Sequence, residues 1–230
     1  MQSISYDTLG VNSGILLDLP FREGTGIITQ DVAKSHHPIT MVNTPTWTTL
    51  ASKLGVLTLD GVNQYLQCTN ASSADLGFTT EDYSVSGWFN WTTGGNTSQI
   101  IMGRYEVFVG GWELYLYETL TLTMRHSHAG GVATRTAVYS AGWAYDTWHF
   151  MGFSRSGATG LFYRNGVALA TLGDALEDIE PTTYPLNIGQ RYAGNTNYFK
   201  GSMYRLRIWS RVLTPTEWLR LYNSEAALFA

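Results

Sequence analysis

The acidic residues that could serve as a general acid and a general base lie in two short clusters. Residues 174–180 read DALEDIE, directly before Pro181 in a predicted loop, and residues 113–118 read ELYLYE. Two carboxylates that cleave a glycosidic bond must face one cleft, about 5 Å apart when configuration is retained. The first cluster lacks a suitable spacing, and Glu113 and Glu118 are an odd number of positions apart, which sends them to opposite strand faces. We interpret both clusters as solvated charges.

Two histidine pairs, at 36–37 and at 126 and 128, invite a metal interpretation. His126 and His128 are two positions apart, so both imidazoles would share one face of a strand, which suits zinc. No acidic residue or cysteine lies near the second pair in sequence to complete a site. The chain also lacks a G-x-S-x-G motif, an obvious histidine partner for Cys68, and a glycine-rich phosphate loop before a helix. These observations argue against an enzyme.

Aromatic and polar side chains form the best candidate for a ligand-binding surface. Sugars bind to aromatic faces that are accompanied by a few orienting polar groups. In residues 112–117 and 121–125, leucine and methionine alternate with tyrosine and polar residues, so the latter should share the face opposite the core. The alternative is that these aromatics cover a sheet face or contact a neighbouring subunit. The predicted ligand-binding residues are Tyr115, Tyr117, Thr123, Arg125, Trp143 and Tyr145.

Composition and charge exclude several classes of protein. The chain has 230 residues, of which 44% are hydrophobic and 14% are charged, and its net charge is −4. No basic run is present, so a nucleic-acid partner is not expected. A single cysteine rules out a disulfide within the chain. The N-terminal residues lack the basic and apolar regions of a signal peptide, and no apolar run is long enough to insert in a membrane.

Short apolar runs bounded by Gly, Asn, Asp, Ser or Pro predict β-strands throughout the chain. Their even spacing is typical of a sandwich or barrel. Asn165-Gly166, between LFYR and VALA, predicts a two-residue hairpin turn, since both positions accept positive φ angles. This assignment outweighs a catalytic role for Arg164-Asn165-Gly166.

One helix is expected near the C-terminus, in LTPTEWLRLYN. Thr214 and Glu217 form a capping box, and Pro215 occupies the first helical position. Trp218, Leu219 and Tyr222 would form one apolar stripe, which we expect to pack under the edge of the sandwich. No linker is visible, so residues 1–230 are predicted to form one domain with its core at about 14–223.

An ordered set of segments resembles the laminin-G-like branch of the concanavalin A-like lectin/glucanase superfamily. The segments are GILLDLPFREGTG (14–26), LTLDGVNQYLQC (57–68), EDYSVSGWFNW (81–91), GGWELYLY (110–117), DTWHFMGFSRSGATGLFYRNGV (146–167), PLNIGQR (185–191) and FKGSMYRLRIWSRVLTPTEWLRLYN (199–223). The resemblance implies an all-β jelly-roll sandwich of two antiparallel sheets with one short C-terminal helix. The Glu-x-Asp-x-x-Glu motif of the glucanase relatives is missing.

The resemblance also bears on metals. Relatives often bind calcium on the rim through Asp, Asn and backbone carbonyl groups. Asp60 and Asn63 are the best candidates by position, although a simple Asp-Gly turn explains them as well. Calcium is therefore an optional ligand, and no cofactor is required. Tyr204-Arg205 stand where many relatives carry an Asp-Glu pair, which puts any metal or salt bridge formed by that pair in doubt.

Two functional hypotheses follow. The first is a non-catalytic recognition domain that binds a glycan or another cell-surface or particle-surface ligand. The second is a structural subunit that decorates a phage or virus particle, with capsid or tail proteins or further copies of the chain as partners. A virion surface or another extracellular particle would then be the location. Glycoside hydrolysis is a distant third.

The purified protein is expected to release no reducing ends from a panel of polysaccharides, because no pair of carboxylates converges in the sequence pattern. A colorimetric reducing-sugar assay measures this directly. Turnover of any substrate in the panel would overturn the non-catalytic interpretation.

Overall fold

Alternating apolar side chains form strands along the whole described chain, as the sequence predicts. The computed structural model describes residues 10–128, 130–137, 143–192, 194 and 196–230. The strands of these residues are β1 (Ile15–Leu19), β2 (Ile28–Gln30), β3 (Pro38–Val42), β4 (Thr46–Thr49), β5 (Gly55–Asp60), β6 (Tyr65–Cys68), β7 (Tyr83–Trp91), β8 (Ser98–Glu106), β9 (Gly110–Tyr117), β10 (Thr121–His128), β11 (Gly131–Ala137), β12 (Trp148–Ser156), β13 (Thr159–Arg164), β14 (Val167–Ala168), β15 (Thr171–Gly173), β16 (Leu186–Ile188) and β17 (Lys200–Trp209). The helices are α1 (Pro215–Glu225) and short 3-10 turns at Gly10–Asn12, Ala71–Leu76 and Ala226–Phe229.

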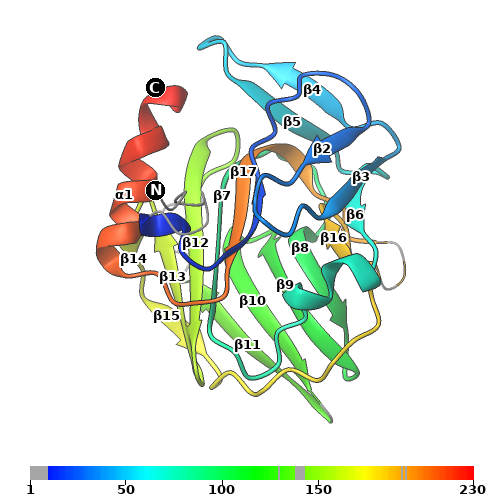
Figure 1. Ribbon diagram of the computed structural model, residues 1–230, viewed down its shortest axis with the longest axis vertical. Coiled ribbons are helices and arrows are strands. Elements are labelled where there is room, and N and C mark those ends of the chain that lie inside the picture. Colours follow the sequence, from blue (N-terminus) through cyan, green and yellow to red (C-terminus); the bar gives the residue numbers. More distant parts are fainter. Residues whose placement is uncertain (1–9, 129, 138–142, 193, 195) are drawn as a thin grey trace, which may run out of the picture.

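Within the described residues the strands assemble into two antiparallel sheets (Figure 1). An eight-stranded sheet has the order β14-β13-β12-β7-β17-β5-β4, and β1 also pairs with β17. A nine-stranded sheet has the order β15-β11-β10-β9-β8-β16-β6-β3-β2. The predicted all-β sandwich of two antiparallel sheets with one short C-terminal helix is therefore confirmed.

The main core lies between the two sheets. Leu114, Leu116, Leu122 and Met124 of β9 and β10 are buried in it, together with side chains of β7, β12 and β17. Because successive side chains of a strand point to opposite faces, the residues between these four belong to the outer face of the nine-stranded sheet. The inward half of the predicted alternation is thus confirmed.

The predicted hairpin turn and the predicted helix cap are also confirmed. Asn165 and Gly166 have φ angles of 50° and 79°, and they join β13 to β14 through the pairing of Arg164 with Val167. At α1 the side chain of Thr214 accepts a hydrogen bond from the backbone N–H of Glu217 at 3.3 Å, which completes the predicted capping box.

Helix α1 lies on the outer face of the eight-stranded sheet, beside β12 to β14 (Figure 1). Our prediction that it packs under the sandwich edge is correct in part: α1 contacts the edge strand β14, but it extends over the outer face of the sheet. The reason is that the eight-stranded sheet turns a second apolar surface outward, including Trp88 and Phe150, and Trp218 packs on it. Leu221 is buried there, whereas Leu219 is exposed, so the helix is rotated from the predicted stripe.

A cluster of charges ties α1 to the sheet. Arg205, at a bulge of β17, binds Glu225 of α1 at 3.1 Å and Asp18 of β1 at 3.4 Å. Glu225 also binds Arg207 and accepts a hydrogen bond from the indole N–H of Trp88 at 2.8 Å. Arg205 is thus a cation that links β1 to α1.

The contact between α1 and the sheet requires a glycine at position 152 of β12. A methyl group at Gly152 would collide with the buried ring of Trp218, with Cη2 only 2.7 Å away. We expect Gly152→Ala to lower the free energy of unfolding by about 1–3 kcal/mol through overpacking, measured by urea denaturation. Gly55→Ala is the control, since its nearest atom is 4.0 Å away. Equal stability of the two variants would contradict this account of the helix position.

Candidate functional site

A row of polar positions crosses the outer face of the nine-stranded sheet. The cross-strand register places Arg125 opposite Glu113, Glu113 opposite Gly103, and Gly103 opposite Asn187. Asn187 lies opposite Gln67, and its side-chain oxygen accepts a hydrogen bond from that glutamine at 3.0 Å. Five adjacent strands, β10 to β6 in the sheet order, therefore contribute to this row, in which Glu113 and Asn187 are buried.

Glu113 is the central charge of this row. Its side chain is 1% exposed, and Arg191 donates to its two oxygens from Nε at 2.9 Å and from Nη2 at 2.6 Å. Arg125 donates from Nη1 at 3.1 Å. Burial raises the pKa of Glu113 above its ordinary value, while the hydrogen bonds and charge of Arg191, and then of Arg125, act in the opposite direction. Our interpretation of Glu113 as a solvated charge is wrong, because two arginines replace its water.

Gly103 makes room for this carboxylate. A methyl group at Gly103 would lie 2.7 Å from Cβ of Glu113, so any side chain there would displace the acid from its place in the row. The glycine therefore lets Arg191, which follows β16, reach across β8 to β9.

Tyrosine rings surround the two guanidinium groups. Arg125 lies 4.9 Å from the ring centre of Tyr115 and 5.7 Å from that of Tyr105, and Arg191 lies 5.7 Å from the same Tyr105 ring. Nη2 of Arg125 also donates to the hydroxyl of Tyr115 at 2.6 Å. We call these five residues (Tyr105, Glu113, Tyr115, Arg125 and Arg191) the tyrosine–arginine patch.

The predicted pairing of the two strands is confirmed, but the predicted exposure is only partly correct. Thr123 pairs with Tyr115, and both share the outer face with Arg125. Tyr115 and Thr123 are nevertheless buried. Tyr115 is covered because the long side chain of Arg125 lies over its ring. Tyr117, farther along the same face, is 38% exposed.

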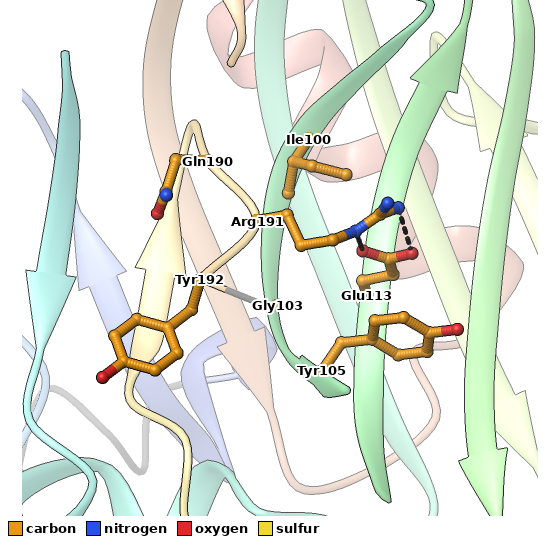
Figure 2. Close-up of a pocket in the computed structure, with 7 residues that line it drawn as sticks. All are labelled: Ile100, Gly103, Tyr105, Glu113, Gln190, Arg191 and Tyr192. Atoms are coloured by element: carbon orange, nitrogen blue, oxygen red, sulfur yellow. Dashed lines mark hydrogen bonds and ion pairs between the residues drawn. The ribbon is translucent and has the colours of Figure 1, made fainter. Parts of the chain in front are cut away.

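A shallow hollow lies beside the patch (Figure 2). It is too tight to enclose a ligand, and Tyr105, Glu113, Gln190, Arg191 and Tyr192 are among the residues that line it. Figure 2 shows the Arg191 guanidinium reaching over to Glu113, while Gln190 and Tyr192 lie on the other side of the same loop. The hollow is not a pocket of the size that encloses a small molecule, so a ligand at this site would bind over the surface.

The two other predicted aromatics belong elsewhere. Trp143 is buried, and its ring packs edge-on against Trp91 and His149 in the core between the sheets. Tyr145 packs against the same core and donates its hydroxyl to the backbone oxygen of Glu118 at 3.1 Å. Their described contacts do not bring them to the tyrosine–arginine patch.

Asp60 and Asn63 lie in the loop between β5 and β6. One carboxylate oxygen of Asp60 accepts hydrogen bonds from the backbone N–H groups of Val62, Asn63 and Gln64 at 2.8–3.2 Å. Burial acts to raise the pKa of Asp60, but these backbone bonds outweigh it and lower the pKa. Within the described residues no group of three His, Cys, Asp or Glu could hold a metal ion. Calcium at Asp60 stays a prediction that these contacts do not favour.

His126 faces the core instead of a metal site. Its Nδ1 lies 3.1 Å from the backbone oxygen of Glu177 and must donate to it, so Nε2 accepts the hydroxyl of Tyr83 at 2.7 Å. Burial lowers the pKa of His126 to about 3, which keeps the ring neutral. Both ring nitrogens are therefore used within the protein.

A second hollow, along β2 and β3, is lined by His37, a buried histidine that lies between two carboxylates. Nδ1 of His37 lies 2.6 Å from Asp31, and Nε2 lies 2.9 Å from Asp75. Asp31 also accepts backbone hydrogen bonds from Asp18 and Ala33, which fixes its position. Burial acts to lower the pKa of His37, but the bonds to Asp31 and Asp75 outweigh it and raise the pKa to about 9. We interpret this triad as an electrostatic clamp that stabilises the fold.

Three members of the patch, Tyr105, Glu113 and Arg191, were not among the predicted ligand-binding residues. Arg191 is separated from Glu113 by 78 positions, and no local pattern connects them. Tyr105 follows a bulge in β8 between Ile100 and Met102, which breaks the simple alternation. The sequence contained one signal for the centre of the site: Glu113 alternates with the core residue Leu114 on a predicted strand.

The comparisons with known proteins agree with this fold. The Laminin_G_3 family, described as Concanavalin A-like lectin/glucanases superfamily, matches residues 60–217. No protein with a curated description matches the sequence. No helix of the described chain combines the length and the apolar character needed to cross a bilayer.

Three solved structures resemble the chain over more than nine-tenths of its length. The receptor binding domain of botulinum neurotoxin D has a TM-score of 0.72 and 13% identity, with 94% of this chain and 54% of that chain covered. The binding domain of Paraclostridial Mosquitocidal Protein 1 has a TM-score of 0.71 and 14% identity, with coverages of 94% and 53%. A structure of botulinum neurotoxin type C, whose cell entry depends on interaction with two ganglioside molecules, has a TM-score of 0.68 and 13% identity, with coverages of 93% and 52%. The chain thus spans about half the length of these structures, and the likeness shows the fold.

The His37 clamp predicts a dependence of stability on pH. Because the folded pKa lies above the ordinary value of 6.5, the clamp stabilises fully below about pH 6.5 and its contribution is lost as the pH rises through about 9. We expect urea denaturation to show that the wild type loses about 2 kcal/mol between pH 6 and pH 10 relative to His37→Gln. A constant stability difference between the two proteins over this range would contradict the clamp.

Proposed function

Since the chain belongs to the Laminin_G_3 family of the concanavalin A-like lectin/glucanase superfamily, we propose that it is a non-catalytic recognition domain that binds a glycan on a cell surface. The proposed binding surface is the tyrosine–arginine patch with the adjoining hollow. The observation that carries the proposal is that tyrosine rings and fixed guanidinium groups lie together on the outer face of the nine-stranded sheet.

The chemistry of the patch suits a sugar. Tyr105 and Tyr115 are buried against the guanidinium groups, which can orient the hydroxyls of a sugar, and an exposed tyrosine ring offers an apolar face for the C–H surface of a pyranose. Tyr192 is 43% exposed at the edge of the hollow, where a ring could contact a bound sugar. Glu113 holds both arginines in place before any ligand arrives, which lowers the entropy lost on binding.

The geometry supports a binding role over a catalytic one. Glu113 is the one carboxylate among the described residues that line the hollow. It is buried and engaged by two arginines, whereas glycosidases require a pair of carboxyl groups that flank the scissile bond. We therefore place no hydrolytic step at this site.

The similar solved structures support a role in surface recognition. The three structures above are described as binding domains or as a toxin that depends on gangliosides for cell entry, so the fold serves surface recognition in those proteins. The proposal requires no cofactor, and calcium at Asp60 and Asn63 is tested by adding EDTA to the binding assay. The alternative of a capsid or tail decoration subunit stays a prediction, and light scattering for a defined oligomer or particle-bound state tests it.

We expect the protein to give signal on a glycan array, and Tyr192→Ala to reduce binding of the best ligand about fivefold to tenfold through loss of ring contact. Leu219→Ala is the control, because it removes an exposed apolar side chain from α1 on the opposite sheet. Titration calorimetry measures the dissociation constants. A blank array, with and without calcium, would refute the proposed function.

A further inference from the structure

The tyrosine–arginine patch carries more positive than negative charge. Two guanidinium groups converge on one carboxylate, which leaves an excess of one positive charge within the cluster. Glu113 is buried, while the side chains of Arg125 and Arg191 are 27% and 20% exposed. The negative charge therefore lies beneath the surface, and the parts of the cluster that reach solvent are cationic.

Arg191 also retains a hydrogen-bonding edge that the pair with Glu113 does not use. A guanidinium has five N–H donors and can bind one carboxylate along the Nε–Nη2 edge and another along the Nη1–Nη2 edge. Arg191 binds Glu113 along the first of these edges. The bond to Glu113 also fixes the orientation of the second edge, and Arg191 is one of the residues that line the hollow.

From this arrangement we infer that the ligand is an acidic saccharide whose carboxylate binds between Arg191 and Arg125, an assignment that rests on the proposed glycan-binding function. The sugar ring lies against the exposed ring of Tyr192 at the edge of the hollow, and its carboxylate neutralises the excess charge. The hollow is too tight to enclose a sugar, so the saccharide lies over it at the surface, where both arginines reach solvent.

A carboxylate fits this site better than a sulfate. The guanidinium fork matches the planar, two-oxygen geometry of a carboxylate, and the site already holds one carboxylate, that of Glu113, by this fork. A neutral sugar would leave the excess charge unmatched. Uronic acids and sialic acids both carry the required group, so both are tested.

The experiment measures the affinity of the full chain for five probes by titration calorimetry. The probes are sialyllactose, lactose, sulfolactose, oligogalacturonate and the methyl ester of oligogalacturonate. We expect one of the two carboxylate sugars to bind at least about tenfold more tightly than its neutral counterpart, and this preference to fall as salt is raised. The two carboxylate sugars distinguish a sialic acid from a uronic acid.

Variants of Arg191 test the contact with the carboxylate. Arg191→Gln should weaken carboxylate binding about tenfold, and Arg191→Lys should restore only part of it, because the charge returns without the fork. Arg220→Gln, an exposed cation on α1, controls for net charge and should leave affinity unchanged. Circular dichroism of each variant identifies loss of folding, in which case Arg191→Lys carries the test.

The outcomes separate the two proposals. If lactose binds as well as sialyllactose and binding still depends on Tyr192, the acidic assignment fails and the proposed function stands. Tighter binding of sulfolactose than of both carboxylate sugars would overturn the choice of a carboxylate. Equal affinity of wild type and Arg191→Gln for the carboxylate sugars would overturn the assignment of the carboxylate to Arg191. Absence of binding by every probe together with a blank glycan array would refute the function itself.

Discussion

Each residue of a β-strand turns its side chain to the face opposite that of its neighbours, and this constraint governs both the core and the candidate site. On β9, Leu114 and Leu116 must face the opposing sheet to bury their side chains. Glu113 and Tyr115 are thereby committed to the outer face, whatever their own preference for water. The packing of the core thus fixes which side chains of β9 form the site. A shift of register by one residue would turn Glu113 and Tyr115 toward the core and Leu114 and Leu116 to the outer face.

On the outer face, the buried charge of Glu113 is compensated by two arginines. An isolated buried carboxylate costs several kcal/mol, and loss of one partner from a buried pair typically costs about 3–5 kcal/mol. Glu113 is satisfied by Arg125 from the neighbouring strand and by Arg191 from the loop after β16. The same bonds hold the arginines rigid near solvent, so stability and preorganisation for a ligand have one origin.

The two sheets use their outer faces differently. The eight-stranded sheet turns an apolar cluster outward beside the charges of Asp18, Arg205 and Arg207, and α1 covers this cluster through Trp218 over Gly152, with Glu225 anchored to Arg205 and Arg207. The nine-stranded sheet instead turns a polar row outward. A helix over this row would bury unpaired polar groups, and the polar composition is compatible with a surface that stays open to a hydrophilic ligand.

The sequence by itself determined the features that depend on neighbours in the chain. Asn165-Gly166 permits positive φ angles, Thr214 and Glu217 cap a helix within four residues, and the alternation of Leu114 and Leu116 assigns an inner face; all three hold in the structure. Only the tertiary structure decided where α1 lies, that Trp143 is buried in the core, and that Arg191 meets Glu113 across 78 positions. The physical reason is range: backbone and capping preferences act over a few residues, whereas the pairing of distant charges follows from how the strands are ordered in the sheet.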